Sequence, residues 1–381
     1  MLKTFLDNKP LYYDKIDYTR MPRVYNSIKE SLALPKIIHL VGTNGKGTTG
    51  RFLASALHTL GFSTGHYTSP HILEFNERIW LNGSDADNAL LEEAHLTLLS
   101  LLDPKDAEAL SYFEYTTLLA IFVYQECDYV VLEAGLGGEH DATAVFENIL
   151  TLITPIDFDH EAFLGSDIES IATTKIRAVR TRAILAKQEH DAVLSVAEVI
   201  AEEKSVNIDP LSEFLKEDDL VKIKQVAKEL RLAPYLEDNL MLSVAALNCL
   251  GLAYTPQIFK NARLFGRLSP IGENILVDVG HNTLAARSIY ETLKKNKYIL
   301  VYNSYKDKNY KEILQILKPI VLHVELIKVK EERIEEMQTM HKALEDLKIE
   351  YKDFRGVDKE YRYLVFGSFS VVEAFLKEYR E

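Results

Sequence analysis

A glycine-rich turn between an apolar run and an amphipathic segment is the stretch of this chain best suited to chemistry. Residues 37–49 read Ile-Ile-His-Leu-Val-Gly-Thr-Asn-Gly-Lys-Gly-Thr-Thr. Glycines let backbone N–H groups turn toward an anion, and the N-terminus of a following helix adds partial positive charge. Lys46 can reach the β/γ-phosphate oxygens, and the hydroxyl of Thr48 or Thr49 can ligate Mg²⁺. The stretch therefore predicts a site for a nucleotide polyphosphate.

The spacing of this turn departs from the strict phosphate-loop pattern, in which the lysine runs directly into a serine or threonine. Here Gly47 separates Lys46 from Thr48. The alternative interpretation is a plain glycine turn with a solvated lysine. The apolar run before the turn and the helical spacing of the apolar residues after it favour the phosphate loop.

Two other apolar stretches are followed by oxygen-bearing side chains that suit a metal ion. Glu133 ends the run 129–133, and a carboxylate in that place can face a phosphate loop across one Mg²⁺. Ser69 follows a shorter apolar stretch and can add an oxygen ligand. The alternatives are that Glu133 caps the next turn and that Ser69 belongs to an ordinary Ser-Pro turn.

Further polar residues are expected at the same rim. His160 ends a polar segment that follows an apolar run, and it is a candidate metal or phosphate ligand, although a lone histidine is often structural. Lys175 lies in a helical stretch that could return to the same cleft; considered alone, it is a solvated helix lysine. Asp141 follows a glycine-rich segment and is expected on this rim too.

The elements that must position these residues alternate between strands and helices. Apolar runs predict strands at 37–41, 64–67, 129–133, 149–153 and 182–186. Helical spacing predicts helices at 22–33, 48–60, 88–102, 113–126, 168–179, 190–203 and 237–251. The charged stretch 207–232 is expected to form a small antiparallel or irregular insert under a helix. The alternation predicts βαβ crossovers and a mostly parallel sheet.

After a break at 254–270 the alternation restarts. It predicts strands at 274–279, 298–302, 320–327 and 362–366, and helices at 283–295, 308–317, 332–347 and 370–379. The predicted fold class is α/β: a P-loop-containing parallel-sheet ATPase domain at residues 1–264, followed by a smaller Rossmann-like α/β domain at residues 265–381. The cleft between two such units is the default place for chemistry.

Bulk composition narrows the function classes. The 381 residues are 47% hydrophobic and 27% charged, which is ordinary for a soluble protein of two domains. No run of eighteen apolar residues predicts a membrane span, and residues 1–10 do not form a signal-peptide pattern. The net charge of −13 argues against a nucleic-acid partner. Cys127 and Cys249 are interpreted as buried thiols, so we expect a cytoplasmic protein.

Seven short motifs occur in an order that carries a family resemblance. They are Gly-Thr-Asn-Gly-Lys-Gly-Thr (42–48), Thr-Ser-Pro-His (68–71), Glu-Ala-Gly-Leu-Gly-Gly (133–138), Asp-His (159–160), Phe-Gly-Arg (265–267), Asp-Val-Gly-His-Asn (278–282) and Val-Phe-Gly-Ser-Phe (365–369). With them the chain resembles the folylpolyglutamate synthase/dihydrofolate synthase branch of the Mur ligase family, from about residue 14 to the C-terminus. The extra Gly47 resembles the folate-branch form of the loop.

The resemblance implies roles for individual residues. ATP would be held by Asn44, Gly45, Lys46, Gly47, Thr48, Asn239, Arg267 and Asp278. Mg²⁺ would be held by Ser69, Glu133 and His160, and Lys175 matches a lysine that is carbamylated in the family. The pterin would be held by Phe113, Glu114, Tyr115, Thr116, His140, Asp141 and Ala142, beneath an N-terminal segment at 17–23. The catalytic set would be Lys46, His160, Lys175 and His281, the last positioning the second substrate or its phosphate.

The implied activity is ATP-dependent addition of L-glutamate to dihydropteroate, and to tetrahydrofolate or its polyglutamates, by a monomeric enzyme. A carboxylate is a poor electrophile, so ATP would convert it to an acyl phosphate, releasing ADP, before the glutamate amine displaces phosphate. One alternative is a Mur-type ligase acting on another carboxylate. Another is a nucleotide-switched binding protein, which would leave Ser69, His160 and Lys175 without a role.

Overall fold

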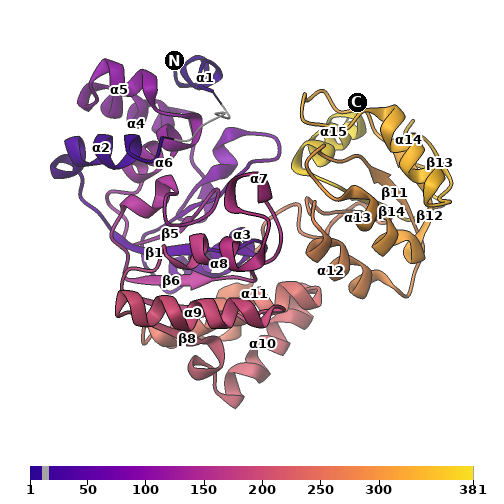
Figure 1. Ribbon diagram of the computed structural model, residues 1–381. Helices are drawn as coiled ribbons and strands as arrows, with labels where there is room; N and C mark the ends of the chain where they lie inside the picture. Colours follow the sequence, from indigo (N-terminus) through magenta and orange to yellow (C-terminus); the bar gives the residue numbers. More distant parts are fainter. Residues whose placement is uncertain (11–16, 381) are drawn as a thin grey trace. The chain divides into compact units, whose positions relative to one another are not determined.

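The chain forms two compact units, each built on its own sheet (Figure 1). The computed structural model describes residues 1–10 and 17–380. Unit 1 comprises Met1–Leu232 and Leu236–Arg263, and unit 2 comprises Ala233–Tyr235 and Leu264–Glu381. Within the described residues, each helix is too short or too polar to cross a membrane.

Unit 1 is organised by an eight-stranded sheet in the order β4-β3-β2-β5-β1-β6-β7-β8. Its strands are β1 (Lys36–Val41), β2 (Thr64–Tyr67), β3 (Ile79–Leu81), β4 (Ser84–Asp85), β5 (Tyr129–Glu133), β6 (Leu150–Ile153), β7 (Arg182–Leu185) and β8 (Asn207–Pro210). All neighbouring strands pair in parallel except β3 and β4, which extend one edge antiparallel. The parallel order brings the carboxyl ends of β1, β2, β5 and β6 to one edge of the sheet.

Helices cover both faces of this sheet. They are α1 (Leu2–Asp7), α2 (Arg20–Ile28), α3 (Lys46–Thr59), α4 (Asn88–Leu101), α5 (Pro104–Ala109), α6 (Tyr112–Val123), α7 (Glu161–Leu164), α8 (Ile168–Ile176), α9 (Asp191–Lys204), α10 (Glu217–Leu230) and α11 (Pro234–Cys249). Short 3₁₀ helices lie at Lys29–Ser31, Phe75–Arg78, Ala142–Val145, Leu211–Phe214 and Pro256–Phe259. Ile37 packs with α2, α4 and α6, whereas Ile38 packs with α3 and α11. Alternate residues of the buried strand β1 therefore enter different cores.

One prediction for unit 1 is wrong. The stretch 207–232 is not an antiparallel or irregular insert, because it contributes β8, which pairs in parallel with β7, and the helix α10. Residues of β8 are exposed or half-buried at the sheet edge. An edge strand therefore lacks the apolar run that signals an interior strand.

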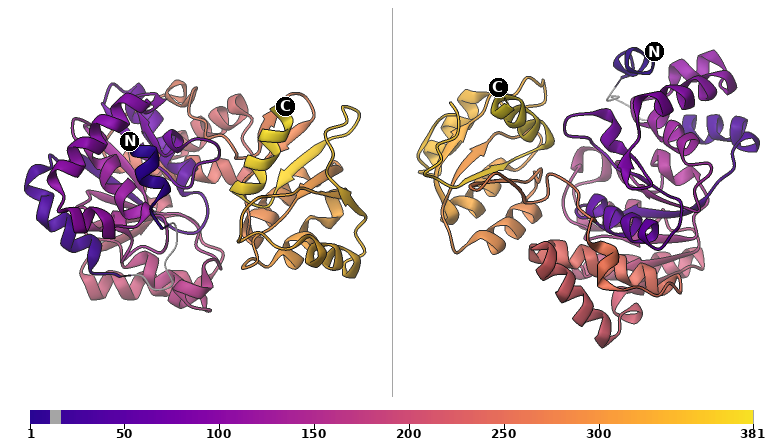
Figure 2. Two further views of the ribbon diagram at one scale, coloured as in Figure 1. Left: turned by 90° about the horizontal axis from the view of Figure 1, so that it is seen from above. Right: turned by 180° about the vertical axis from the view of Figure 1, so that it is seen from behind.

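Unit 2 holds a six-stranded sheet in the order β13-β12-β11-β14-β10-β9. Its C-terminal strands and helices are the orange-to-yellow part of the ribbon in Figures 1 and 2. Its strands are β9 (Ser269–Ile271), β10 (Ile275–Val277), β11 (Tyr298–Tyr302), β12 (Val321–Leu326), β13 (Tyr351–Asp353) and β14 (Tyr363–Phe366), and only β9 is antiparallel among them. Its helices are α12 (Thr283–Leu293), α13 (Tyr310–Leu317), a 3₁₀ turn (Lys318–Ile320), α14 (Met337–Asp346) and α15 (Phe369–Arg380). Helices α12, α13 and α14 share one core with β11. The two mostly parallel sheets with crossover helices confirm the predicted α/β class.

Candidate functional site

The phosphate loop lies between the carboxyl end of β1 and the first turn of α3. Gly42 has φ +136° and Gly45 has φ +93°, backbone conformations that favour glycine. A Cβ on Gly45 would collide with the Asn239 side chain. The Thr43 N–H donates to the Pro155 carbonyl at 2.9 Å, so the segment after β6 supports the loop. The loop therefore keeps its shape only with glycines, and Asn239 of α11 lies directly against it.

Lys46 and Glu133 face each other across this edge of the sheet. The distance from Lys46 Nζ to Glu133 Oε1 is 4.0 Å, and both side chains are largely buried. Lys46 Nζ also donates to the carbonyls of Gly42 at 3.0 Å and Thr43 at 3.2 Å. A buried charge needs such partners, because its desolvation is costly. The structure thus brings the predicted cation and the predicted carboxylate together.

The segment after β2 also reaches Glu133. The Thr68 hydroxyl donates to Glu133 Oε2, and the Ser69 N–H lies 3.4 Å from the same oxygen. Thr68 was missed in the sequence, although its place beside Ser69 after a strand was an available signal. Two adjacent residues therefore orient the carboxylate that is expected at the metal.

Two buried hydroxyls in the first turn of α3 test whether a phosphate and its metal fit here. Thr48 is 4% exposed and Thr49 is 0% exposed, and neither Oγ1 has a hydrogen-bond partner among the described residues. A buried hydroxyl without a partner costs about 1–3 kcal/mol. Phosphate oxygens or Mg²⁺ would supply the missing partner. The residues of this turn therefore fit a nucleotide phosphate with its Mg²⁺.

The donor set also suits a divalent cation such as Mg²⁺ when a phosphate is bound. The described residues hold no group of three or more His, Cys, Asp or Glu that could bind a metal unaided. Mg²⁺ is typically bound through one or two carboxylates, with phosphate and water oxygens completing its shell. Glu133, with the hydroxyls near it, matches that requirement.

Lys175 lies at the phosphate loop. Its side chain is buried, and Nζ donates to the Gly42 carbonyl at 3.0 Å. Burial, together with the nearby positive charge of Lys46, lowers the pKa of Lys175 to about 7, and the negative charges of Asp159 and Asp141 oppose the shift. The interpretation of Lys175 as a solvated helix lysine is therefore wrong.

His160 begins α7 in the left-handed region, with φ +55°. Its Nε2 lies 3.9 Å from Asp159 Oδ2, and its backbone N–H donates to Asp159 Oδ1 at 2.9 Å. A non-glycine residue in this conformation is unusual and points to a constrained position. The segment that carries His160 is the one that supports the phosphate loop through Pro155.

Glu114 is engaged inside unit 1. It pairs with Arg20 of α2 at 2.8 Å and accepts the Ser111 N–H at 2.7 Å in the capping box of α6. Both charged side chains are about nine-tenths buried. Arg20 was missed as the partner of Glu114, although it falls within the N-terminal segment at 17–23.

The neighbours of Glu114 lie beside it in α6, and we call residues 113–116 and 140–142 together the wall. Tyr115 is fully buried, with its hydroxyl 2.7 Å from His95 Nδ1, and the Thr116 hydroxyl lies 2.9 Å from the Tyr67 hydroxyl. Phe113 is half-buried, and its ring occupies the space that a Cβ on Gly135 would need. Among residues 113–116, Phe113 is the one whose side chain is least enclosed.

Asp141 organises the glycine-rich loop that follows Glu133. Its Oδ2 accepts the N–H groups of Gly135 at 3.0 Å and Leu136 at 2.9 Å, and its Oδ1 accepts the Thr143 N–H and hydroxyl at 2.9 and 2.6 Å. Burial raises the pKa of Asp141, and these hydrogen bonds oppose the shift. Ala142 is buried and begins the following 3₁₀ helix.

His140 stands beside the N-terminal segment. Its side chain is exposed, and its ring centre lies 4.6 Å from that of Tyr18. The ring of Tyr18 is also exposed. The structure therefore brings the 17–23 segment and His140 together at one surface of unit 1.

In unit 2, Asp278 is the centre of a buried network. It accepts the Leu268 N–H at 2.8 Å, the Gly280 N–H at 2.8 Å and the Tyr235 hydroxyl at 2.7 Å. Burial raises the pKa of Asp278, and the charge of Arg267 opposes the shift. Tyr235 was not foreseen, because nothing in the sequence links it to a residue beyond the break at 254–270.

Arg267 and His281 lie near the carboxyl edge of the unit 2 sheet. The Arg267 guanidinium carbon is 5.3 Å from the centre of the Phe369 ring. His281 Nδ1 is 3.1 Å from the Val279 carbonyl. The motifs at 265–267, 278–282 and 365–369 therefore meet within one unit.

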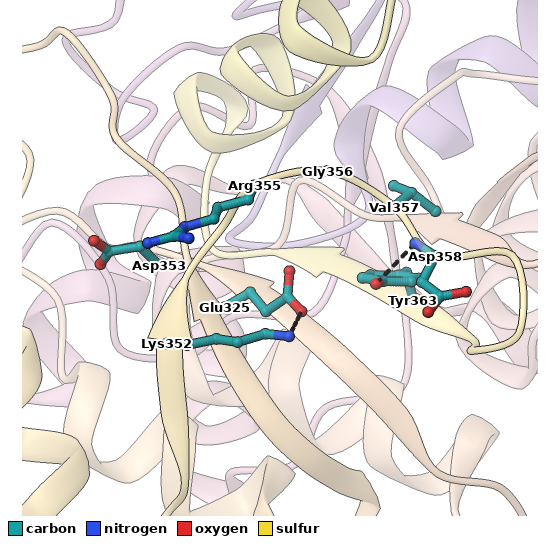
Figure 3. Close-up of a pocket in the computed structure, with 8 residues that line it drawn as sticks. All are labelled: Glu325, Lys352, Asp353, Arg355, Gly356, Val357, Asp358 and Tyr363. Carbon is teal, nitrogen blue, oxygen red and sulfur yellow. Dashed lines mark hydrogen bonds and ion pairs between the residues drawn. The ribbon is translucent and has the colours of Figure 1, made fainter.

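Unit 2 contains a cavity of about 490 Å³, whose lining residues are drawn in Figure 3, and its lining is not that of a nucleotide site. It is lined by Glu325, Lys352, Asp353, Arg355, Gly356, Val357, Asp358 and Tyr363. Lys352 pairs with the buried Glu325 at 3.0 Å, and the Asp358 N–H donates to the Tyr363 hydroxyl at 3.1 Å (Figure 3). A polyphosphate needs convergent donors, whereas this lining mixes both charge signs and includes none of the predicted site residues.

Comparison with known proteins shows relatives that cover most or all of the chain. No protein-family model matches the chain. The chain is 32% identical over 334 residues to the dihydrofolate synthase/folylpolyglutamate synthase of Haemophilus influenzae, covering 77% of this chain and 76% of that protein. The structure of Helicobacter pylori folylpolyglutamate synthetase matches with a TM-score of 0.81 and 39% identity, covering 100% and 98% of the two chains. Escherichia coli FolC in complex with DHPP and ADP matches with a TM-score of 0.82 and 25% identity, covering 99% and 97%.

Proposed function

Because the chain belongs to the dihydrofolate synthase/folylpolyglutamate synthase family, we propose that it is an ATP-dependent ligase that adds L-glutamate to dihydropteroate. The proposal includes tetrahydrofolate or its polyglutamates as further acceptors. ATP turns the acceptor carboxylate into an acyl phosphate with release of ADP, and the glutamate amine then displaces phosphate to form the amide. No observation favours a Mur-type ligase for another carboxylate or a nucleotide-switched binding protein.

The observation that carries the proposal is the phosphate loop with its unpartnered hydroxyls. Lys46 and the N-terminus of α3 supply positive charge at the place where the γ-phosphoryl group would pass from ADP to the acceptor carboxylate. The Thr48 hydroxyl is buried and has no hydrogen-bond partner among the described residues, and a phosphate oxygen or Mg²⁺ would supply one. A bound Mg²⁺ supplies neutralisation of the phosphate charge. Ser69, Glu133 and His160 are the residues we assign to hold it.

Lys175 is assigned a role beside the metal. Its pKa of about 7 leaves a large share of the amine neutral near neutral pH. A neutral amine is the form that adds CO₂ to become a carbamate, whose oxygens can face a cation. The buried position at the Gly42 carbonyl supports this assignment.

The remaining assignments concern the two substrates and the nucleoside. We assign Asn44, Gly45, Gly47 and Asn239 to contacts with the nucleotide, and we assign Arg267 and Asp278 to nucleotide contacts as well. Phe113 and His140 are assigned to contact the pterin, while Glu114, Tyr115, Thr116, Asp141 and Ala142 hold the wall behind them. His281 is assigned to the glutamate or its phosphate. We further propose that the enzyme is monomeric and acts in the cytoplasm; light scattering on the purified protein tests the first of these.

Product identification tests the acceptor assignment. The purified enzyme is incubated with ATP, Mg²⁺ and L-glutamate, and with dihydropteroate or tetrahydrofolate in parallel, and products are identified by mass spectrometry. We expect a product one glutamyl residue heavier than dihydropteroate, and glutamylated tetrahydrofolate in the second reaction. Absence of any glutamylated pterin in both reactions would remove the folate assignment.

A further inference from the structure

A histidine occupies a position in the buried strand β1 where an apolar side chain would suffice. His39 is 1% exposed and stands between Ile38 and Leu40. Its Nε2 lies 2.7 Å from the Thr143 hydroxyl, and its Nδ1 has no partner among the described residues. An unpartnered buried nitrogen is costly. Packing alone therefore does not account for a histidine at this position.

The hydrogen-bonding partners of Thr143 show which atom donates in the contact between His39 and Thr143. Thr143 Oγ1 contacts both His39 Nε2 and Asp141 Oδ1, at 2.7 and 2.6 Å. A hydroxyl has one proton to donate, and a carboxylate only accepts. Thr143 therefore donates to Asp141 and accepts from His39, which must carry its proton on Nε2. Burial lowers the pKa of His39 to about 4, so the ring stays neutral near neutral pH.

This chain of hydrogen bonds ends on the loop between two residues of the candidate site. Asp141 holds the N–H groups of Gly135 and Leu136, just after Glu133. Farther along the same loop, the Glu139 N–H donates to the Thr174 carbonyl at 2.8 Å. A Cβ on Gly138 would lie 2.8 Å from the Lys175 Cα, so the loop packs directly on that backbone.

We propose that His39 is a positioning residue: through Thr143 and Asp141 it fixes the loop 134–139, and with it the placement of Glu133 and Lys175. His39 touches neither of these side chains and acts only through the two intermediaries. Its consequence for turnover rests on the proposed ligase function. The loop placement itself does not depend on that function.

Two substitutions separate positioning from packing. His39→Leu keeps the buried volume but removes the donor to Thr143, whereas His39→Gln keeps an N–H at about the place of Nε2. In the ligase assay we expect kcat of His39→Leu to fall by about 10-fold or more, as for other residues that orient site groups from behind. The KM for ATP should stay within about twofold, because Lys46 and the glycines are untouched. His39→Gln should recover most of the lost kcat.

A matched control is available on the neighbouring strand β2. His66 is also fully buried with one unpartnered nitrogen, but its other nitrogen accepts from Arg51 at 3.3 Å and has no link to the loop 134–139. His66→Leu therefore reports the cost of losing a buried histidine as such. We expect it to lower Tm while leaving kcat within about threefold of the wild type.

Hydrogen–deuterium exchange supplies a readout that needs no activity. Exchange of the Gly135 and Leu136 amides should accelerate by about 10-fold or more in His39→Leu and stay at the wild-type rate in His39→Gln and His66→Leu. Wild-type exchange in His39→Leu, or equal acceleration in His66→Leu, would overturn the positioning role. An inactive wild type would overturn the ligase function instead, and the exchange rates would still decide the role of His39.

Discussion

The phosphate loop and the wall formed by 113–116 and 140–142 treat their polar groups in opposite ways. In the loop, the hydroxyls of Thr48 and Thr49 are buried without a partner among the described residues. In the wall, Glu114 is paired with Arg20, and Asp141 accepts four hydrogen bonds. An unpartnered buried group is costly, and in the first turn of α3, directly after the glycine-rich turn, a bound phosphate or metal ion would supply the bond that these two hydroxyls lack. The polar groups of Glu114 and Asp141 already have partners within the protein, so we interpret these two residues as structural support for the site.

The difference in hydrogen bonding separates residues that would contact a ligand from residues that shape the binding site around it. Substitutions in the loop should change turnover more than stability, and substitutions at the paired wall residues should do the reverse. Phe113 and His140 are the wall residues left with accessible side chains. They are therefore the ones expected to discriminate between acceptors.

Lys46→Ala should give the largest effect on turnover. Removing the cation that faces Glu133 takes away charge stabilisation of phosphoryl transfer, and we expect kcat to fall by about 10³-fold. The protein should stay folded, because removing Lys46 also relieves its repulsion of the nearby Lys175, which offsets part of the lost contact with Glu133. Steady-state ADP release and thermal denaturation measure both quantities, with the exposed Lys29→Ala as control. Turnover near the wild-type rate in Lys46→Ala would contradict the assignment of the loop to turnover and of the paired wall residues to stability.

Glu133→Gln should rank next. It keeps the shape and the contact with Thr68 but removes the charge assigned to the metal, and we expect kcat to fall by about 10²-fold. The Mg²⁺ concentration for half-maximal rate should rise. A Mg²⁺ titration of the ligase rate measures this, with Glu139→Gln as an exposed control of the same type. An unchanged Mg²⁺ requirement would exclude Glu133 as a ligand.

Glu114→Gln should affect stability instead of turnover. It removes the negative charge that faces the buried Arg20 side chain, and we expect the free energy of unfolding to fall by about 3 kcal/mol. The control is Asp106→Asn, which breaks the more exposed pair with Arg23 and should cost less than about 1 kcal/mol. Denaturant titration measures both. A kcat loss in Glu114→Gln larger than that of Glu133→Gln would reverse the contrast.

The pH dependence of stability tests the buried state of Lys175. The pKa of Lys175 is 10.5 in the unfolded chain and about 7 in the folded protein. Between pH 7 and pH 10.5 the unfolded chain therefore binds more protons than the folded protein does. Stability from this group should therefore rise with pH above about 7, by at most about 1.4 kcal/mol per pH unit. Denaturant titrations at pH 7 and 9 in CO₂-depleted buffer should show a smaller rise in Lys175→Met. Equal slopes in both proteins would contradict the lowered pKa.

Local patterns were sufficient to predict most of the fold and the phosphate loop. The interior strands β1, β5, β11 and β14 are buried on both faces, so each appears in the sequence as an apolar run. The edge strands β8 and β13 are polar and escaped prediction. The stretch 207–232 was misinterpreted for that reason.

Long-range partners could not be read from the chain. Arg20 and Glu114 are 94 residues apart, and His39 and Thr143 are 104 residues apart. Each partner alone looks like an ordinary polar residue, and only the register of the sheet and the packing of α2 on α6 bring them together. For Lys175 the sequence allowed a helix that returns to the same cleft, but not the specific contact of Nζ with the Gly42 carbonyl.

The most direct test of the central claim is ADP release with each substrate omitted in turn. The wild-type enzyme is assayed with ATP, Mg²⁺, dihydropteroate and L-glutamate, and then without dihydropteroate, without glutamate and without Mg²⁺. We predict rapid ADP release only in the complete mixture, with a loss of most of the rate on each omission. ADP release at the same rate without dihydropteroate would contradict a ligase that activates a pterin carboxylate.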